Sequence, residues 1–195
     1  NRWTKPIKLG PSVNHESVSF SSTHPYLAPH KSKKKRTLYF SSNKPGGLGG
    51  YDLWSVDIDQ KLACGSARNL GKKINSPGDE ITPFVYSEEQ ILYYSSNGKA
   101  GFGGFDVYMA KKRGSRFKNA TSLGKPFNTG ADEFSFQPYK KNKYVLVSNR
   151  EGAATYHAHY VLDDLFIIKK KTIDKFLLVK VFVQDSLQRE INDKK

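Results

Sequence analysis

One stretch of this chain occurs twice, and this internal repeat constrains the fold more than any other feature. Residues 38–56 read LYFSSNKPGGLGGYDLWSV, and residues 92–110 read LYYSSNGKAGFGGFDVYMA. A third, decayed copy begins at Val145 with VLVSNREG and resumes at Asp163 with DDLFII. The period is about 53 to 54 residues, a length typical of stacked repeat architectures. We therefore expect three copies of one supersecondary unit.

The segment that precedes each copy also repeats. It reads WTKPIKLGPSVNHE at residues 3–16, ARNLGKKINSPGDE at 67–80 and ATSLGKPFNTGADE at 120–133. The three segments share a Leu-Gly pair and end in the same residue type, at Glu16, Glu80 and Glu133. The alignment predicts that these glutamates are equivalent and hold the same structural position in each unit.

Each unit contains four short strand candidates separated by turn residues. In the second unit the candidates are Ile81–Tyr86, Ile91–Ser95, Asp106–Lys111 and a strand that ends at Leu123-Gly124. Apolar and polar residues alternate with period 2, and no stretch shows a helical period. Four strands per unit at this period are typical of a β-propeller blade.

The predicted fold is therefore all-β, with about three four-stranded antiparallel blades at residues 1–58, 59–112 and 113–170. Closed propellers contain four to eight blades, so we expect these three to form part of a larger ring.

The glycines and the aspartate of the glycine-rich loop are explained by the structure of the loop itself. Glycine supplies backbone conformations and close approaches that other residues resist, and the aspartate that follows can accept hydrogen bonds from the loop N–H groups. An aspartate that recurs once per unit is more simply explained by turn structure than by catalysis. The loop signature comprises Gly46, Gly47, Gly49, Gly50, Asp52, Gly101, Gly103, Gly104, Asp106 and, in the decayed copy, Asp164.

These motifs resemble the WD40-like repeats of TolB-type propellers. The similarity is strongest to the glycine-rich variety in Bacteroidota-type envelope proteins that carry an OmpA-like, peptidoglycan-binding domain. It rests on LYFSSNKPGGLGGYDLW, LYYSSNGKAGFGGFDVY and INSPGDEITPFV, and covers residues 1–170. The segment FLLVKVFVQDSLQREI, within residues 171–195, resembles the first strand of a carboxypeptidase-regulatory-like domain.

The resemblance implies a non-catalytic interaction scaffold in the periplasm, associated with the outer membrane. Its expected partners are other envelope proteins, in a type IX secretion or gliding complex, with peptidoglycan bound through another domain. The resemblance leaves two other functions open, namely the gating propeller of a serine peptidase and a glycan-binding or lyase propeller. The sequence beyond Lys195 would distinguish the peptidase from the scaffold.

The chain has a formal net charge of +14 and a sequence pI of about 9.7, so it attracts anionic partners. The densest run of positive charge is an insertion in the first unit, which we identify as a candidate partner-binding patch. Lys111–Arg113, Lys140–Lys143 and Lys169–Lys171 are further basic clusters and predict a positive rim. No aromatic-interleaved recognition motif accompanies them, so nucleic acid is not an expected partner. The candidate patch consists of Lys31, Lys33, Lys34, Lys35 and Arg36.

No motif of catalysis or cofactor binding occurs in the sequence. There is no nucleophile elbow, zinc-binding helix motif or phosphate-binding loop, so we expect no enzyme activity, cofactor or metal. His157 and His159 share a face if they lie on a strand, but no clear further ligands accompany them. His24, His30 and Cys64 are interpreted as incidental. No apolar run is long enough for a membrane span.

Overall fold

The computed structural model describes residues 3–28, 35–87, 90–140, 142–153, 155–156, 160–161 and 163–169. Within these ranges the protein is all-β, without a helix, as the sequence predicted. No helix of the described residues could cross a membrane. Several sequence predictions fall outside the described residues, namely those for segment 171–195, for His30, His157 and His159, and for Lys31, Lys33 and Lys34.

The strands form three main antiparallel sheets, none of which closes on itself. The first sheet has the order β1-β2-β3-β4 and consists of Ser22–Ala28, Lys35–Ser42, Asp52–Asp59 and Arg68–Asn69. The second contains β5, β6 and β7 (Glu80–Tyr86, Ile91–Ser96 and Asp106–Arg113), and β7 also pairs with the short strands β8 (Arg116–Phe117) and β9 (Thr121–Ser122). The strand predictions for the second unit are confirmed.

The third sheet has the order β10-β11-β14, formed by Glu133–Lys140, Lys143–Ser148 and Asp164–Lys169. Between its last two strands, Thr155–Tyr156 (β12) and Tyr160–Val161 (β13) form a separate two-stranded ribbon. This ribbon occupies the position at which the first two units carry the glycine-rich loop.

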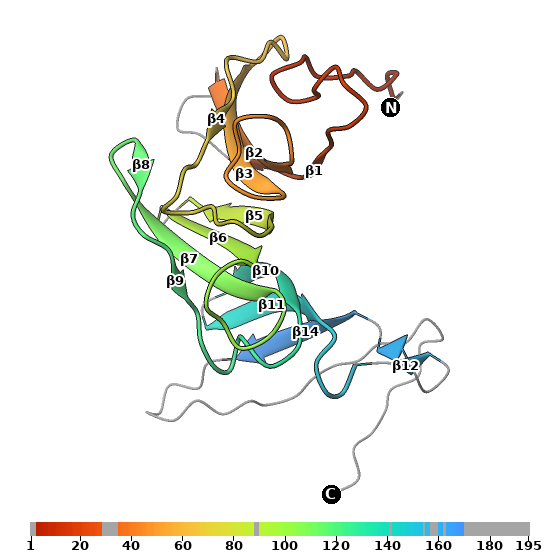
Figure 1. Ribbon diagram of the computed structural model, residues 1–195, viewed down its shortest axis with the longest axis vertical. Coiled ribbons are helices and arrows are strands. Elements are labelled where there is room, and N and C mark those ends of the chain that lie inside the picture. The colour runs from red at the N-terminus through yellow and green to blue at the C-terminus, as the bar shows by residue number, and fades with distance from the viewer. Residues whose placement is uncertain are drawn as a thin grey trace, which may run out of the picture.

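The three sheets follow one another from top to bottom in Figure 1. The first strand of each following sheet packs on the sheet before it. Strand β5 contacts β1, β2 and β3, and β10 contacts β5, β6 and β7. The central strand β6 is buried on both faces. Leu92 and Tyr94 face the first sheet, whereas Ile91 and Tyr93 face the third. Burying one such side chain contributes about 1.5 to 3 kcal/mol, so the contacts between sheets are the main apolar core.

The N-terminal segment covers the outer face of the first sheet. Leu9 and Val13 pack on Phe40 and Trp54 in a third apolar cluster. Cys64 also joins this cluster and is half-buried. The first sheet is thus buried on both faces, although no further sheet lies above it among the described residues.

The first strand of each sheet contains the same irregularity. His24, Thr82 and Ser135 have positive φ angles of 47°, 50° and 54°, and each interrupts the register with its neighbouring strand. Each is the third residue of its strand. The repeat is therefore conserved in backbone conformation even where the residue types differ.

The register also corrects one sequence alignment. Glu80 pairs with Ser96 and Glu133 with Ser148, but the equivalent position in the first sheet is Ser22, which pairs with Ser42. Glu16 lies six residues earlier and is exposed. The prediction that Glu16 is equivalent to the other two glutamates is wrong, because the first unit has additional residues between its Leu-Gly pair and its first strand.

Candidate functional site

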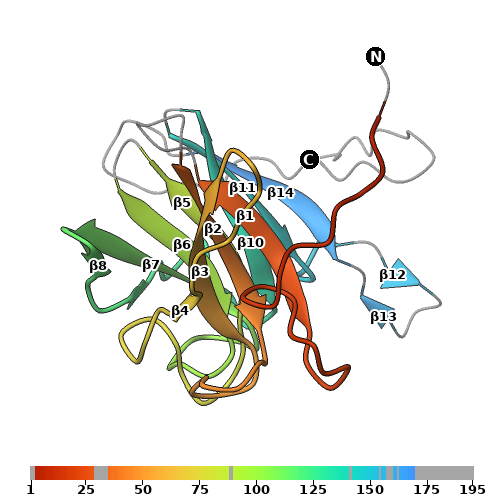
Figure 2. The same ribbon diagram turned by 90° about the horizontal axis from the view of Figure 1, so that it is seen from above.

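The stack of sheets has two chemically different ends. At the loop end lie the glycine-rich loops and the residues that begin β1, β5 and β10, and Figure 2 shows the loops of the first two sheets together at the bottom of the view. At the basic end lie the last residues of β1, β5 and β10, the first residues of β2, β6 and β11, and the ends of β3, β7 and β14. Most residues singled out from the sequence fall on one of these two ends.

At the loop end, the carboxylates of Asp52 and Asp106 hold their own loops. The N–H groups of Leu48 and Gly49 donate to Asp52, at 2.5 and 3.3 Å. The equivalent N–H groups of Phe102 and Gly103 donate to Asp106, at 2.8 and 3.1 Å. Both aspartates are buried, so these carboxylates serve the loop backbone and are not presented to solvent.

Close packing explains the glycines at the second half of each loop. A Cβ on Gly49 would lie 2.4 Å from the Ser76 carbonyl oxygen, and one on Gly103 would lie 2.1 Å from the Ala131 carbonyl oxygen. Both oxygens belong to the loop that leads into the next sheet. The glycine requirement therefore arises from the contact between neighbouring units.

The decayed third unit keeps the aspartate position but not the loop. Asp164 pairs in register with Ser148, as Asp52 does with Ser42. The neighbouring Asp163 has its pKa raised by burial and by the charges of Asp132 and Asp164. Asp163 thus adds an acidic group at the position where the first two units carry Tyr51 and Phe105.

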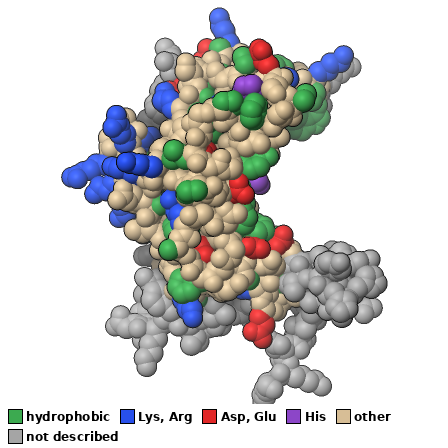
Figure 3. Space-filling model, viewed as in Figure 1, with side chains coloured by type: hydrophobic (Ala, Val, Ile, Leu, Met, Phe, Trp, Pro, Cys, Tyr) green, Lys and Arg blue, Asp and Glu red, His purple; other side chains and the backbone are tan. Residues whose placement is uncertain are grey.

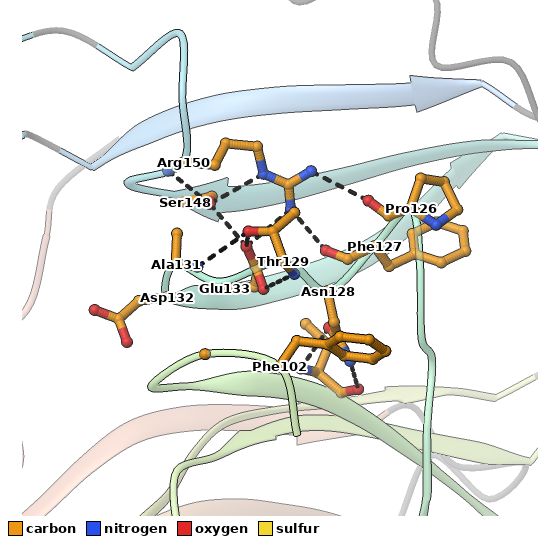
Figure 4. A network of polar contacts seen from close by, with 12 residues as sticks. Phe102, Pro126, Phe127, Asn128, Thr129, Ala131, Asp132, Glu133, Ser148 and Arg150 are labelled. Carbon is orange, nitrogen blue, oxygen red and sulfur yellow. Dashed lines mark hydrogen bonds and ion pairs between the residues drawn. The ribbon is translucent and has the colours of Figure 1, made fainter. Parts of the chain in front are cut away.

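Two buried glutamates organise the start of the second and third sheets. Glu80 accepts hydrogen bonds from Ser76 N–H at 2.8 Å and from Ser96 Oγ at 2.6 Å. Burial raises the pKa of Glu80, and the hydroxyl and amide donors partly oppose that rise. Glu133 accepts in the same way from Thr129 and from Ser148, as Figure 4 shows.

Glu133 also forms a buried ion pair. Arg150 Nη2 lies 3.2 Å from Glu133 Oε1, and both side chains are buried. The same guanidinium donates to the carbonyl oxygens of Pro126 and Phe127, at 3.2 and 2.6 Å (Figure 4). Burial lowers the pKa of Arg150, an effect that Glu133 opposes. The bonds to these two carbonyl oxygens attach the third sheet to the loop before it.

The first unit uses a lysine where the third uses Arg150. Lys44 Nζ donates to the Ser12 carbonyl oxygen at 2.5 Å and lies 4.3 Å from the Trp54 ring centre. Arg150 likewise lies 5.3 Å from the ring centre of Phe166. These cations are structural, and the sequence alignment did not single them out because the second unit has glycine at this position.

Across the part of the chain that the structure describes, no group of three or more His, Cys, Asp or Glu residues could hold a metal ion. His24 lies on β1, and burial lowers its pKa. Its ring contacts Thr23 Oγ1 at 2.9 Å. No nucleophile paired with a base is evident among the described polar contacts.

The basic end carries charge that the fold does not neutralise. The β7–β8 hairpin has five cations in residues 111–118 and no acid. Within the described residues, none of them takes part in an ion pair, and Arg113 pairs directly with Arg116 across the hairpin. Figure 3 shows Lys and Arg side chains gathered over this hairpin. The five are Lys111, Lys112, Arg113, Arg116 and Lys118.

The same end of the third sheet has a row of lysines. Lys143 pairs in register with Lys140 on β10 and with Lys169 on β14. Like charges directly opposite one another in a sheet are destabilising. Of the predicted patch Lys31–Arg36, the structure describes the backbone of Lys35 and the exposed Arg36, which begin β2 at this end.

The described residues of the first sheet include two acids at this end. Asp57 lies 3.1 Å from Arg68 in an exposed ion pair, and Asp59 caps its own turn by accepting from the N–H groups of Lys61 and Ala63. Among the described residues, the positive charge is therefore densest on the second and third sheets.

Comparison with known proteins identifies no relative of this chain: neither a family model nor a curated protein matches its sequence.

Proposed function

We propose that the three sheets are neighbouring blades of a TolB-type β-propeller, and that the chain is a non-catalytic interaction scaffold. The observation that carries this proposal is the recurrence of one set of contacts between successive sheets. Asp79 and Asp132 each accept a hydrogen bond from the preceding glycine-rich loop, at Tyr51 and Phe105. The second and third sheets are also joined at equivalent positions 53 residues apart, where the backbone N–H of Ser135 donates to Thr82 Oγ1 at 3.1 Å.

A scaffold is favoured over an enzyme because the candidate catalytic groups have structural partners. Asp52, Asp106, Glu80 and Glu133 are buried and accept hydrogen bonds from backbone or hydroxyl donors. A catalytic carboxylate must instead reach the reacting atoms of a substrate.

The basic end is the proposed partner surface. Uncompensated surface charge accelerates association with a partner of opposite charge and contributes to specificity. Together with the resemblance to OmpA-family envelope proteins, this supports a periplasmic, outer-membrane-associated location and acidic protein partners in a secretion or gliding complex. Peptidoglycan would be bound through another domain.

The test is affinity purification of the tagged protein from envelope fractions. We expect acidic envelope proteins to be recovered with the wild type and to be lost with the double variant Arg113→Glu/Arg116→Glu. The matched control is Lys99→Glu/Lys125→Glu, which changes the net charge equally but lies at the loop end. Recovery should also decrease as salt increases, because exposed charges are screened.

Equal recovery by both double variants would contradict the basic end as the partner surface. Recovery of nucleic-acid-binding proteins alone would contradict the scaffold.

A further inference from the structure

Each junction between neighbouring sheets uses one asparagine to hold the third strand of the preceding sheet. The Leu53 N–H donates to Asn75 Oδ1 at 2.9 Å, and Asn75 Nδ2 donates to the Leu53 carbonyl oxygen at 3.1 Å. Asn128 makes the same two bonds to Val107, at 2.8 and 2.9 Å. The amide therefore satisfies both backbone groups of one strand residue.

The residue held in this way is also the apolar centre of the junction. Leu53 and Val107 are both 0% exposed. Ile74, next to Asn75, packs in the same cluster as Leu53, and Phe127, next to Asn128, packs beside the cluster of Val107. A complete junction thus combines a strand residue with an aliphatic or aromatic residue and an asparagine on the incoming loop.

The third sheet carries one half of such a junction, namely the strand residue, and this residue is exposed. Leu165 is equivalent to Leu53 and Val107, because all three follow the first residue of the third strand in their sheet. Their partners on the second strand are Val147, Ser41 and Ser95, respectively. The Leu165 side chain is 62% exposed, in contrast to its buried equivalents. The outer face of the third sheet therefore presents the strand side of a junction.

The N-terminal loop carries the other half. Asn14 follows Leu9 by the same interval at which Asn75 follows Leu70, and Val13 takes the place of Ile74. Asn14 Nδ2 donates to the Leu9 carbonyl oxygen at 3.0 Å. Within the described residues, its amide holds no third strand. Trp3, Ile7 and Val18 on the same segment are also exposed.

The charges at the two halves are compatible. Inside the molecule, Asp79 faces the N–H of Tyr51. In the N-terminal loop, Ser21 takes the position of Asp79, because each directly precedes the first strand of its sheet. In the third sheet, Asp163 takes the position of Tyr51, because each directly precedes the third strand of its sheet. An aspartate at position 21 would repel Asp163, whereas a serine hydroxyl can donate a hydrogen bond to it. The change from aspartate to Ser21 in the N-terminal loop is therefore compatible with the change from tyrosine to Asp163 in the third sheet.

We propose that a second copy of this chain occupies the outer face of the third sheet, with its N-terminal loop against β14, so that its Asn14 amide holds the backbone of Leu165. The contact is head-to-tail. Such a heterologous interface forms rings if the rotation closes and filaments if it does not. This inference rests on the repeated junction and does not depend on the proposed partner of the basic end.

Sedimentation velocity of the 195-residue chain over a range of concentrations tests this interface. The wild type should associate as concentration rises, and Leu165→Asp and Asn14→Ala should each weaken association at least tenfold. Leu48→Asp is the matched control, because Leu48 is also exposed but belongs to neither half of the junction. A wild type that stays monomeric at the highest concentration, or an unchanged Leu165→Asp variant, would overturn the proposal.

Mixing the two interface variants separates loss of binding from loss of folding. The Asn14→Ala chain keeps an intact β14 face, and the Leu165→Asp chain keeps an intact N-terminal loop. The mixture should therefore form dimers and nothing larger. Ser21→Cys and Asp163→Cys in a Cys64→Ser background should cross-link only between chains, whereas absence of both the dimer and the cross-link would refute the head-to-tail contact.

Discussion

Ser135 donates its backbone N–H to the hydroxyl of Thr82 at 3.1 Å, and both residues have left-handed backbone conformations in the first strands of adjacent sheets. A non-glycine residue with positive φ is uncommon, and its strain persists only when surrounding contacts enforce it. The hydrogen bond links one such residue directly to the next. The junctions between sheets therefore set the backbone of the sheets themselves, so changes at a junction should affect the stability of the whole stack.

Removal of a junction asparagine should be costly. Asn128→Ala leaves the buried N–H of Val107 without its partner, whereas the Val107 carbonyl oxygen keeps the Leu123 N–H as a donor. An unsatisfied buried polar group costs about 1 to 3 kcal/mol, and we expect a loss of this size in the free energy of unfolding, measured with urea. The control Asn14→Ala, measured at a concentration where the chain is monomeric, should cost much less. A similar loss from both variants would contradict the junction role.

Gly103 and Gly130 form a matched pair for the close contact between units. A Cβ on Gly103 would clash with backbone atoms of Gly130 and Ala131, whereas one on Gly130 meets nothing within 4 Å. Gly103→Ala should destabilise the protein by about 1 to 3 kcal/mol through overpacking, and Gly130→Ala should change stability by less than about 0.5 kcal/mol. Thermal unfolding of the two variants measures the difference. Equal melting temperatures would show that the loop can move aside.

The strands of the second unit could be predicted from the sequence because Ile91–Ser95 and Asp106–Lys111 combine alternation with clear turn residues. The junctions could not. The asparagine of the Leu-Gly segment recurs in all three units, but its two bonds to Leu53 or Val107 join residues about 20 positions apart that no local pattern connects. The error at Glu16 has a similar origin, since an insertion changes register without changing local composition.

The basic end was predictable in part. Lys111–Arg113, Lys140–Lys143 and Lys169–Lys171 are visible as charge runs in the sequence, and antiparallel pairing places the first residues of one strand beside the last residues of its neighbour. The direct opposition of Lys143 and Lys169 depends on a register that only the structure gives.

Glu80 should make stability depend on pH in a definite direction. Its pKa is raised by burial, so above the ordinary value of 4.5 the folded protein still holds a proton that the unfolded chain has released. Stability linked to this group is therefore present at low pH and lost as pH rises through the folded pKa. The stability of the wild type relative to Glu80→Gln should fall between pH 4 and pH 8 in urea titrations.

The control for this pH dependence is Glu16→Gln, because Glu16 is exposed and should give a constant difference from the wild type. A constant difference for Glu80→Gln as well would show that its proton affinity is the same in both states.

Arg150 should be essential because it neutralises a buried carboxylate. Arg150→Met removes the ion pair with Glu133 and the bonds to the carbonyl oxygens of Pro126 and Phe127. Breaking a buried pair by removing one partner costs about 3 to 5 kcal/mol. The double variant Arg150→Met/Glu133→Gln should recover part of that loss, measured by urea unfolding in a double-mutant cycle. A double variant no more stable than Arg150→Met would show that the carbonyl contacts dominate.

The row of Lys140, Lys143 and Lys169 at the basic end should lower the free energy of unfolding while it contributes to partner binding. Lys143 lies between Lys140 and Lys169 in adjacent strands, and a directly opposed like-charge pair is unfavourable by roughly 0.2 to 1 kcal/mol. Lys143→Thr keeps a good strand-forming residue and should raise the free energy of unfolding by up to about 1 kcal/mol in low-salt buffer. The gain should shrink as salt screens the charges. In the control Lys61→Thr, the lost charge lies in the turn held by Asp59, so no gain is expected. If Lys143→Thr is more stable but recovers less of the acidic partner in the affinity purification, the lysine row serves binding. If Lys143→Thr is less stable than the wild type, Lys143 supports the fold.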